Sequence, residues 1–205
     1  MKSLFESSFY FISGHGRGWA FSASDLLGRF SRQQADSLLS ELVGQGKIRR
    51  VARGIYDYPG YSKLLDKTLS PDIDRVARAY ARKFNWRIEV SGDTALNLLG
   101  LSTQVTASYV YLSDGPNRRY TILGQTLVFK KSALKNIGFK YRETTLLVQA
   151  LLALGKEHVT QSVINKMRQQ VALSQRDKIL KDAKSATGWI YEVIRQVCLG
   201  EDQHG

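Results

Sequence analysis

The residues of this sequence that could do chemistry are mostly cationic, amide and hydroxyl side chains, which bind other molecules rather than catalyse reactions. They form two groups: Ser31, Arg32, Gln33, Gln34 and Ser37, followed by Arg49, Arg50 and Arg53. Glutamine can form two hydrogen bonds with adenine, whereas arginine pairs with guanine or with a phosphate. These residue types therefore indicate a contact with nucleic acid.

A helix from Ser31 to Val43 would place the first group on one outward face. Ser31 and Gln34 have the spacing of a capping box, in which each side chain binds a backbone amide of the first turn. Apolar residues then recur at helical spacing, at Ala35, Leu38, Leu39 and Leu42. Glycines end the helix, at Gly44 and Gly46. The polar residues that point away from the apolar face are Gln33, Ser37 and Ser40, with Arg32 and Gln34 beside them.

The second group lies in two short segments that alternate apolar and polar residues, KIRRV and GIYDYP. This alternation predicts a β-hairpin with Gly54 near its turn and Arg49, Arg50 and Arg53 at its tip. Upstream, the pattern predicts a helix over residues 3–12, a short strand at WAFS and a short helix at ASDLLGRF. Three helices and a hairpin within residues 1–60 follow the order of a winged helix-turn-helix. In that fold one helix enters the major groove and hairpin arginines reach phosphates or a minor groove.

A second domain is expected at residues 71–200, after a linker at PGYSKLLDKTLSP (59–71) that is bounded by two prolines. It begins with a helix over residues 72–84, a strand at WRIEV and a short helix closed by Gly100. Two or three strands follow within residues 108–131, with turns at 114–116 and at Gly124. From Glu143 onward the pattern is helical. The expected fold class is α+β: an N-terminal winged helix-turn-helix followed by a mixed α/β domain with a helical C-terminal part.

The charge balance favours an anionic partner. The 205 residues carry 30 Lys and Arg against 18 Asp and Glu, which gives a formal net charge of +12 and a pI near 9.9. Such an excess attracts nucleic acid or an acidic protein surface. Basic residues of the second domain gather in its strand region: Arg118, Arg119, Lys130, Lys131, Lys135 and Lys140. They form a surface for an acidic partner, a second nucleic-acid contact or a solvated sheet face.

The other candidates lead to no catalytic or metal site. Asp72 and Asp74 have the D-x-D spacing with which nucleotidyltransferases hold magnesium, but they follow Pro71 at a helix start, where acidic residues cap amides. The GHGRG segment lacks the GKS or GKT ending of a phosphate-binding loop. The three histidines have no other ligand at metal-binding spacing. We therefore expect no enzyme, no cofactor and no metal, and a phosphotransfer enzyme at Asp72 and Asp74 is the least favoured alternative.

Cysteine content and hydropathy indicate the compartment. The single Cys198 cannot form an internal disulfide, which fits a reducing environment, and its flanking sequence predicts a buried position on a helix. The apolar patch FYFI near the N-terminus is too short and its surroundings too polar for a signal peptide, and no later segment approaches a membrane span. We expect a cytoplasmic protein without a membrane partner.

Five linked segments within about residues 16–155 carry a family resemblance: GRGWAFS, SLLSELVGQGKIRRVARGIYDYP, PDIDRVARAYAR, SGDTALNLLGLSTQV and VYLSDGPNRR. Together they resemble the AbiEi-type antitoxins. The resemblance implies a winged helix-turn-helix that represses its own operon by binding upstream repeats. It also implies an α/β domain that counteracts a nucleotidyltransferase-like toxin in a type IV system, without direct contact between the two proteins. The residues that then fall at the DNA contact are Arg32, Gln33, Ser37, Arg49, Arg50 and Arg53.

The sequence thus predicts a DNA-binding transcriptional autorepressor that serves as the antitoxin of a toxin–antitoxin pair. Its partners would be double-stranded DNA at its own promoter and, functionally, a cognate toxin. The alternative is a protein-interaction module whose basic second domain docks an acidic partner, without sequence-specific DNA binding. Asp36 and Glu41 favour this alternative mildly, because they flank the expected DNA-reading face with negative charge.

Overall fold

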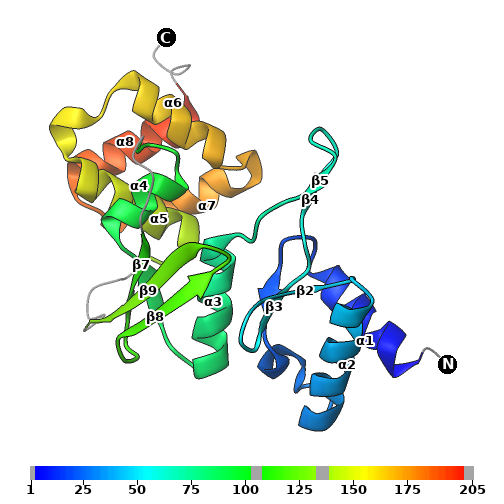
Figure 1. The fold of residues 1–205 in the computed structure, drawn as a ribbon. Coiled ribbons are helices and arrows are strands. Elements are labelled where there is room, and N and C mark those ends of the chain that lie inside the picture. The colour runs from blue at the N-terminus through cyan, green and yellow to red at the C-terminus, as the bar shows by residue number, and fades with distance from the viewer. Residues whose placement is uncertain (1–2, 103–107, 133–138, 201–205) are drawn as a thin grey trace. The chain divides into compact units, whose positions relative to one another are not determined.

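The computed structural model describes residues 3–102, 108–132 and 139–200, and its mixture of helices and short strands belongs to the α+β class (Figure 1). The chain divides into two compact units. Unit 1 comprises residues 1–88 and 119–127, and unit 2 comprises residues 89–118 and 128–205. The first domain expected from the sequence lies within unit 1.

The N-terminal part of unit 1 combines helices with a small sheet. Its helices are α1 (Leu4–Gly14), the 3₁₀-helix η1 (Ala23–Leu26) and α2 (Arg32–Gly44). Its strands are β1 (Ala20–Phe21), β2 (Arg49–Ala52) and β3 (Ile55–Asp57), in the antiparallel order β1-β3-β2. The elements occur in the predicted order. The helix predicted at ASDLLGRF is only the short 3₁₀ segment η1.

α2 begins and ends as its sequence predicts. Ser31 Oγ accepts a hydrogen bond from the Gln34 amide at 3.2 Å, and Gln34 Oε1 accepts one from the Ser31 amide at 2.9 Å. This completes the capping box. The apolar residues of the helix are buried in one core: Ala35, Leu38, Leu39 and Leu42, together with Ile12, Phe21 and Leu26. Burying one such leucine contributes about 1.5–3 kcal/mol, so this core fixes which side chains of α2 face outward.

The helix that follows the expected linker belongs to unit 1. The structure therefore divides the chain after this helix, and not between residues 60 and 71 as predicted. α3 (Ile73–Phe84) begins at its cap Asp72. Near its end, Arg82 donates a hydrogen bond to the Ala20 carbonyl at 2.7 Å and pairs with Asp25 at 2.6 Å. These contacts tie α3 to β1 and η1, which explains why it groups with unit 1.

The segment predicted as a linker contains a small hairpin. β4 (Tyr61–Ser62) pairs antiparallel with β5 (Lys67–Thr68). The connecting turn exposes two leucines, with Leu64 93% and Leu65 56% accessible to solvent. The hairpin therefore buries little apolar surface, which is consistent with the polar composition that suggested a linker.

A four-stranded sheet follows α3, in the order β6-β7-β9-β8. Its strands are β6 (Ile88–Val90), β7 (Ser108–Ser113), β8 (Arg118–Ile122) and β9 (Gln125–Lys131). The turn predicted at Gly124 is confirmed, because Leu123 and Gly124 connect β8 to β9 with φ values of +45° and +90°. Two central residues with positive φ define a type I′ turn, whose twist matches that of antiparallel strands.

Helices make up most of unit 2, and the predicted helical C-terminal part is confirmed. They are α4 (Gly92–Leu98), α5 (Arg142–Leu154), α6 (Gln161–Gln170), α7 (Arg176–Asp182) and α8 (Gly188–Leu199), with 3₁₀ segments η2 (Lys156–His158), η3 (Leu173–Gln175) and η4 (Ala183–Ser185). α4 and α5 approach closely at Gly92, where a Cβ atom would lie 2.5 Å from that of Ala153. Over the described ranges, no helix has both the length and the apolar character that crossing a bilayer requires.

Candidate nucleic-acid interface

The outward face of α2 carries the polar side chains that the sequence predicts. Arg32, Gln33, Ser37 and Ser40 are exposed, while the apolar residues between them are buried. Ser31 and Gln34 are exposed as well, but their side chains are engaged in the capping box. Ser31 and Gln34 therefore hold the start of the helix in place. Gln33 and Ser37, which lie about one turn apart, are the side chains best placed to meet a ligand.

Arg32 has a partner within its own helix. Its Nε atom lies 2.9 Å from Asp36 Oδ2, and the two side chains are 65% and 57% exposed. An exposed pair at this helical spacing contributes only about 0.3–0.5 kcal/mol, so a phosphate can compete for the guanidinium. Asp36 thus lowers the net charge of this face without removing Arg32 from it.

The prediction that Arg49 lies at the hairpin tip is wrong. Arg49 is paired across the sheet with Asp57, at the end of the hairpin away from the turn. Its guanidinium donates to both carboxylate oxygens of Asp57, at 3.0 and 2.6 Å, and to the Leu69 carbonyl at 3.1 Å. Asp57 is only 1% exposed, and a buried carboxylate is costly without a partner. Arg49 therefore stabilises the hairpin, and its contact with DNA stays a prediction.

Arg50 and Arg53 are the exposed arginines of the hairpin. Arg50 lies opposite Tyr56, beside an irregularity in the pairing between Arg50 and Ala52. Arg53 lies in the turn and precedes Gly54, whose φ of +71° is the left-handed conformation that glycine adopts without strain. Among the described residues neither arginine makes an ion pair. Their charges are therefore the ones that the hairpin offers to an anion.

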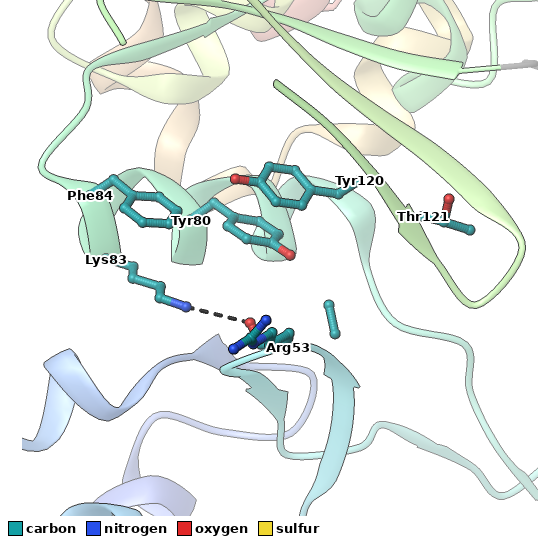
Figure 2. Close-up of a pocket in the computed structure, with 7 residues that line it drawn as sticks. Arg53, Tyr80, Lys83, Phe84, Tyr120 and Thr121 are labelled. Atoms are coloured by element: carbon teal, nitrogen blue, oxygen red, sulfur yellow. Dashed lines mark hydrogen bonds between the residues drawn. The ribbon is translucent and has the colours of Figure 1, made fainter. Parts of the chain in front are cut away.

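Lys83 on α3 joins this group, although nothing in the sequence indicated it. Its Nζ atom lies 3.4 Å from the Arg53 carbonyl oxygen and 3.5 Å from that of Gly54, so the last turn of α3 lies against the hairpin turn (Figure 2). Burial, followed by the charges of Arg32 and Arg53, lowers the pKa of Lys83. The charges of Arg32 on α2 and of Arg53 in the hairpin turn thus both act on Lys83 of α3.

A cavity of about 360 Å³ opens beside these cations within unit 1. Its lining includes Arg53, Tyr80, Lys83, Phe84, Tyr120 and Thr121 (Figure 2). The rings of Tyr80 and Tyr120 stack with centroids 4.0 Å apart. Burial and then the neighbouring Tyr120 raise the pKa of Tyr80, so its hydroxyl stays protonated. The cavity thus combines cationic groups with aromatic rings, and its described lining contains no acidic residue.

The basic residues predicted in the strand region lie on neighbouring strands of the sheet. Arg118 and Arg119 on β8, and Lys130 and Lys131 on β9, are all exposed. Within the described part of the chain, none of the four makes an ion pair. Lys135 lies outside the described residues, and Lys140 is exposed. A surface for an acidic partner, a second nucleic-acid contact and a solvated sheet face therefore all stay predictions for these residues.

The capping interpretation is confirmed for Asp72, whereas Asp74 lies in the first turn of α3. Asp72 Oδ1 accepts hydrogen bonds from the amides of Asp74 and Arg75, at 2.9 and 3.2 Å. Asp74 is buried and pairs with Arg78 at 2.9 Å. The two carboxylates are thus occupied by different partners. Among the described residues, no three His, Cys, Asp or Glu side chains are grouped to hold a metal ion.

Fold and surface define a class: an α+β protein with a capped helix that presents polar side chains, a cationic hairpin turn and an aromatic cavity beside it. The chain belongs to DUF6088, a family of unknown function, which matches residues 11–179. No curated protein matches the sequence. The family match includes α2, the β2–β3 hairpin and α3, so the candidate residues on these elements all lie within the region that defines the family.

Proposed function

We propose that this protein is a DNA-binding transcriptional autorepressor that serves as the antitoxin of a toxin–antitoxin pair. The observation that carries the DNA-binding part is the outward polar face of α2 next to the exposed arginines of the β2–β3 hairpin. In this proposal α1, η1, α2 and the hairpin act as a winged helix-turn-helix. Such a module inserts its second motif helix into the major groove and sets its hairpin on the DNA backbone.

Each exposed residue has a defined task in the proposed complex. Gln33 and Ser37 on α2 contact base edges, where a bidentate glutamine prefers adenine. Arg32 leaves Asp36 to bind a phosphate, and Arg50 and Arg53 bind phosphates or enter the minor groove. Ser31 and Gln34 keep the first turn formed, and the positive end of the helix then favours a nearby phosphate. The net charge of +12 adds long-range attraction to DNA.

The antitoxin part of the proposal rests on the resemblance to AbiEi-type antitoxins. It assigns counteraction of a nucleotidyltransferase-like toxin to the region that follows the DNA-binding module, without direct contact between the two proteins. The exposed basic residues of β8 and β9 are a candidate surface for an acidic partner or a second nucleic-acid contact. The proposal includes a cytoplasmic location and assigns no catalytic step to any residue. The gene beside this one is then the place to look for the toxin.

A gel-shift titration on the DNA upstream of the protein's own gene, with scrambled DNA alongside and at two salt concentrations, tests the DNA-binding part. We expect preferential binding to the upstream DNA. Gln33→Ala should reduce that preference by about 10-fold, because one bidentate base contact discriminates by about 1–3 kcal/mol. Arg50→Ala should weaken binding to both DNAs and lower the salt slope by about one.

Lys166→Ala supplies the matched control for this titration. Lys166 is an exposed lysine on α6, so the substitution removes the same net charge from an element that is not part of the proposed interface. It should leave both affinity and preference nearly unchanged. Equal affinity of the parent protein for upstream and scrambled DNA at both salt concentrations would refute sequence-specific binding.

The second candidate is a protein-interaction module whose basic second domain docks an acidic partner, without sequence-specific DNA binding by α2. The pairing of Arg32 with Asp36 favours it, because a carboxylate on the outward face of α2 opposes DNA. Co-purification of a partner that stays bound at high salt, together with no measurable DNA affinity, would select this function over the first.

A further inference from the structure

Arg53 and Lys83 lie together beside the β2–β3 turn, and the charge of Arg32 on α2 also acts on Lys83. The pKa of Lys83 is lowered, mainly by burial and further by the charges of Arg32 and Arg53, because each of these disfavours the protonated form. The Lys83 ammonium has two long hydrogen bonds, to the carbonyl oxygens of Arg53 and Gly54. Of these three cations, only Arg32 pairs with a carboxylate within the described part of the chain, that of Asp36. An anion placed at Arg53 and Lys83 would relieve this repulsion.

Aromatic rings form the wall of the adjoining cavity. Tyr120 stacks on Tyr80 at 4.0 Å between ring centroids, and Phe84 lies nearly parallel to Tyr80 at 6.2 Å. Phe84 is 42% exposed, and its ring also stacks on Trp86 at 4.7 Å and lies 5.3 Å from Lys83 Nζ. Thr121 completes the cavity from β8 (Figure 2). A ligand in this space meets flat apolar surfaces on one side and cationic groups on the other.

We infer that this cavity binds a nucleoside phosphate, with the phosphate at Arg53 and Lys83 and the base against Tyr120. A phosphate alone would use only the cationic side of the cavity, and an uncharged ring would leave the cationic groups without a counterion. Bases stack on aromatic side chains irrespective of sequence, and a volume of about 360 Å³ suits a ligand of this size. The inference goes beyond the proposed reading of duplex DNA by α2 and does not depend on it.

A free mononucleotide and the unpaired end of a nucleic-acid strand share this chemistry. Calorimetric titration of the intact protein distinguishes them, with the four 5′-mononucleotides in one arm and a 5′-phosphorylated single-stranded tetranucleotide in the other. Adenosine and inorganic phosphate are titrated separately as the two halves of the ligand. We expect a nucleotide or the tetranucleotide to bind at least 10-fold more tightly than either half. Binding of the tetranucleotide alone would identify the strand end as the source of the ligand.

Two variants and one matched control test the location of the site. Arg53→Ala removes a charge from the cavity and should weaken nucleotide binding at least 10-fold. Tyr120→Ala removes the ring against which the base would lie and should also weaken nucleotide binding at least 10-fold. Arg50→Ala removes an exposed arginine of the same hairpin outside the cavity lining and should leave nucleotide binding unchanged.

The inference is overturned if neither the nucleotides nor the tetranucleotide bind saturably, or if Arg53→Ala and Tyr120→Ala both bind like the parent. Thermal unfolding of each variant confirms that it is folded before titration. Arg50→Ala also separates this site from the proposed function, because it should weaken duplex binding in the gel shift while leaving nucleotide binding intact. Failure of duplex binding therefore does not imply failure of the nucleotide site, and the reverse also holds.

Discussion

Arg49 and Arg50 are neighbours on β2, and their side chains have different surroundings. Arg49 neutralises the buried Asp57 carboxylate, whereas Arg50 is exposed. Arg49→Ala should lower the free energy of unfolding by about 2–3 kcal/mol, because it leaves a buried charge unpaired. Arg50→Ala should change it by less than about 0.5 kcal/mol. Urea unfolding of both variants measures the difference, and equal small effects would mean that Asp57 does not need its partner.

Asp182 at the end of α7 connects that helix with the start of α5. Its carboxylate accepts hydrogen bonds of 2.9 Å from the amides of Lys140 and Tyr141. Burial acts to raise the pKa of Asp182, but the hydrogen bonds outweigh it and hold the pKa below the ordinary value of 3.8. Because the pKa is lower in the folded state, Asp182 contributes stability above the unfolded pKa. That contribution is lost as the pH falls through the folded pKa.

Asp182→Asn should therefore unfold at a lower temperature than the parent at pH 7, and the difference should shrink as the pH falls below about 4. Thermal unfolding measured between pH 7 and pH 2.5 gives this dependence. Asp177→Asn, on the same helix, is the control and should follow the parent. A difference for Asp182→Asn that is the same at every pH would contradict the assigned hydrogen bonds.

Contacts between single residues are predictable from sequence only when the partners are close along the chain. The capping box of Ser31 and Gln34 is predictable because the two residues lie three positions apart and their spacing fixes their geometry. The position of Lys83 near Arg53 depends on how α3 packs, and no local pattern encodes it. For the same reason, local alternation places Arg49 at the hairpin tip, although Asp57 holds it at the opposite end.

At the level of elements, the β8–β9 turn departs from the residue preference of its type. A type I′ turn favours asparagine or glycine at both central positions, but Leu123 occupies the first with φ +45° and is 60% exposed. Leu123→Asn should raise the free energy of unfolding by about 0.5–1 kcal/mol, because asparagine tolerates the left-handed conformation. Urea unfolding checks this. Gly124→Ala should have the opposite effect, and a loss of stability in Leu123→Asn would show that the leucine packs usefully.

Periodicity predicts the longer elements well and the shortest ones poorly. α2 has four buried apolar residues at helical spacing between clear start and stop signals, so its position follows from local sequence. The pattern predicts a short helix at ASDLLGRF, but only the 3₁₀ segment Ala23–Leu26 forms, with Gly28 soon after it. The β4–β5 hairpin has two residues per strand, which is too short for alternation to be detected.

For the molecule as a whole, the α+β class can be predicted from the sequence. The division of the chain into its two compact units cannot. Composition and prolines place the boundary at residues 59–71, where the chain does become polar. The structure instead keeps α3 with unit 1, since Arg82 and Arg75 hydrogen-bond to backbone carbonyls of residues 20 and 17. Such contacts join segments more than 50 residues apart, and only the folded chain brings them together. A fragment that ends at residue 60 would therefore lack contacts that the N-terminal sheet makes in the intact protein.

The lone cysteine has a practical consequence for studying the proposed interface. Cys198 is 5% exposed on α8, and burial raises the pKa of its thiol to about 11. A thiol that is buried and protonated at neutral pH reacts slowly with maleimides and methanethiosulfonates, which attack through the thiolate. A second cysteine introduced at Gln33 would therefore be labelled selectively in the native protein. A fluorophore or spin label attached there would report directly on whether the exposed face of α2 becomes covered when DNA is added.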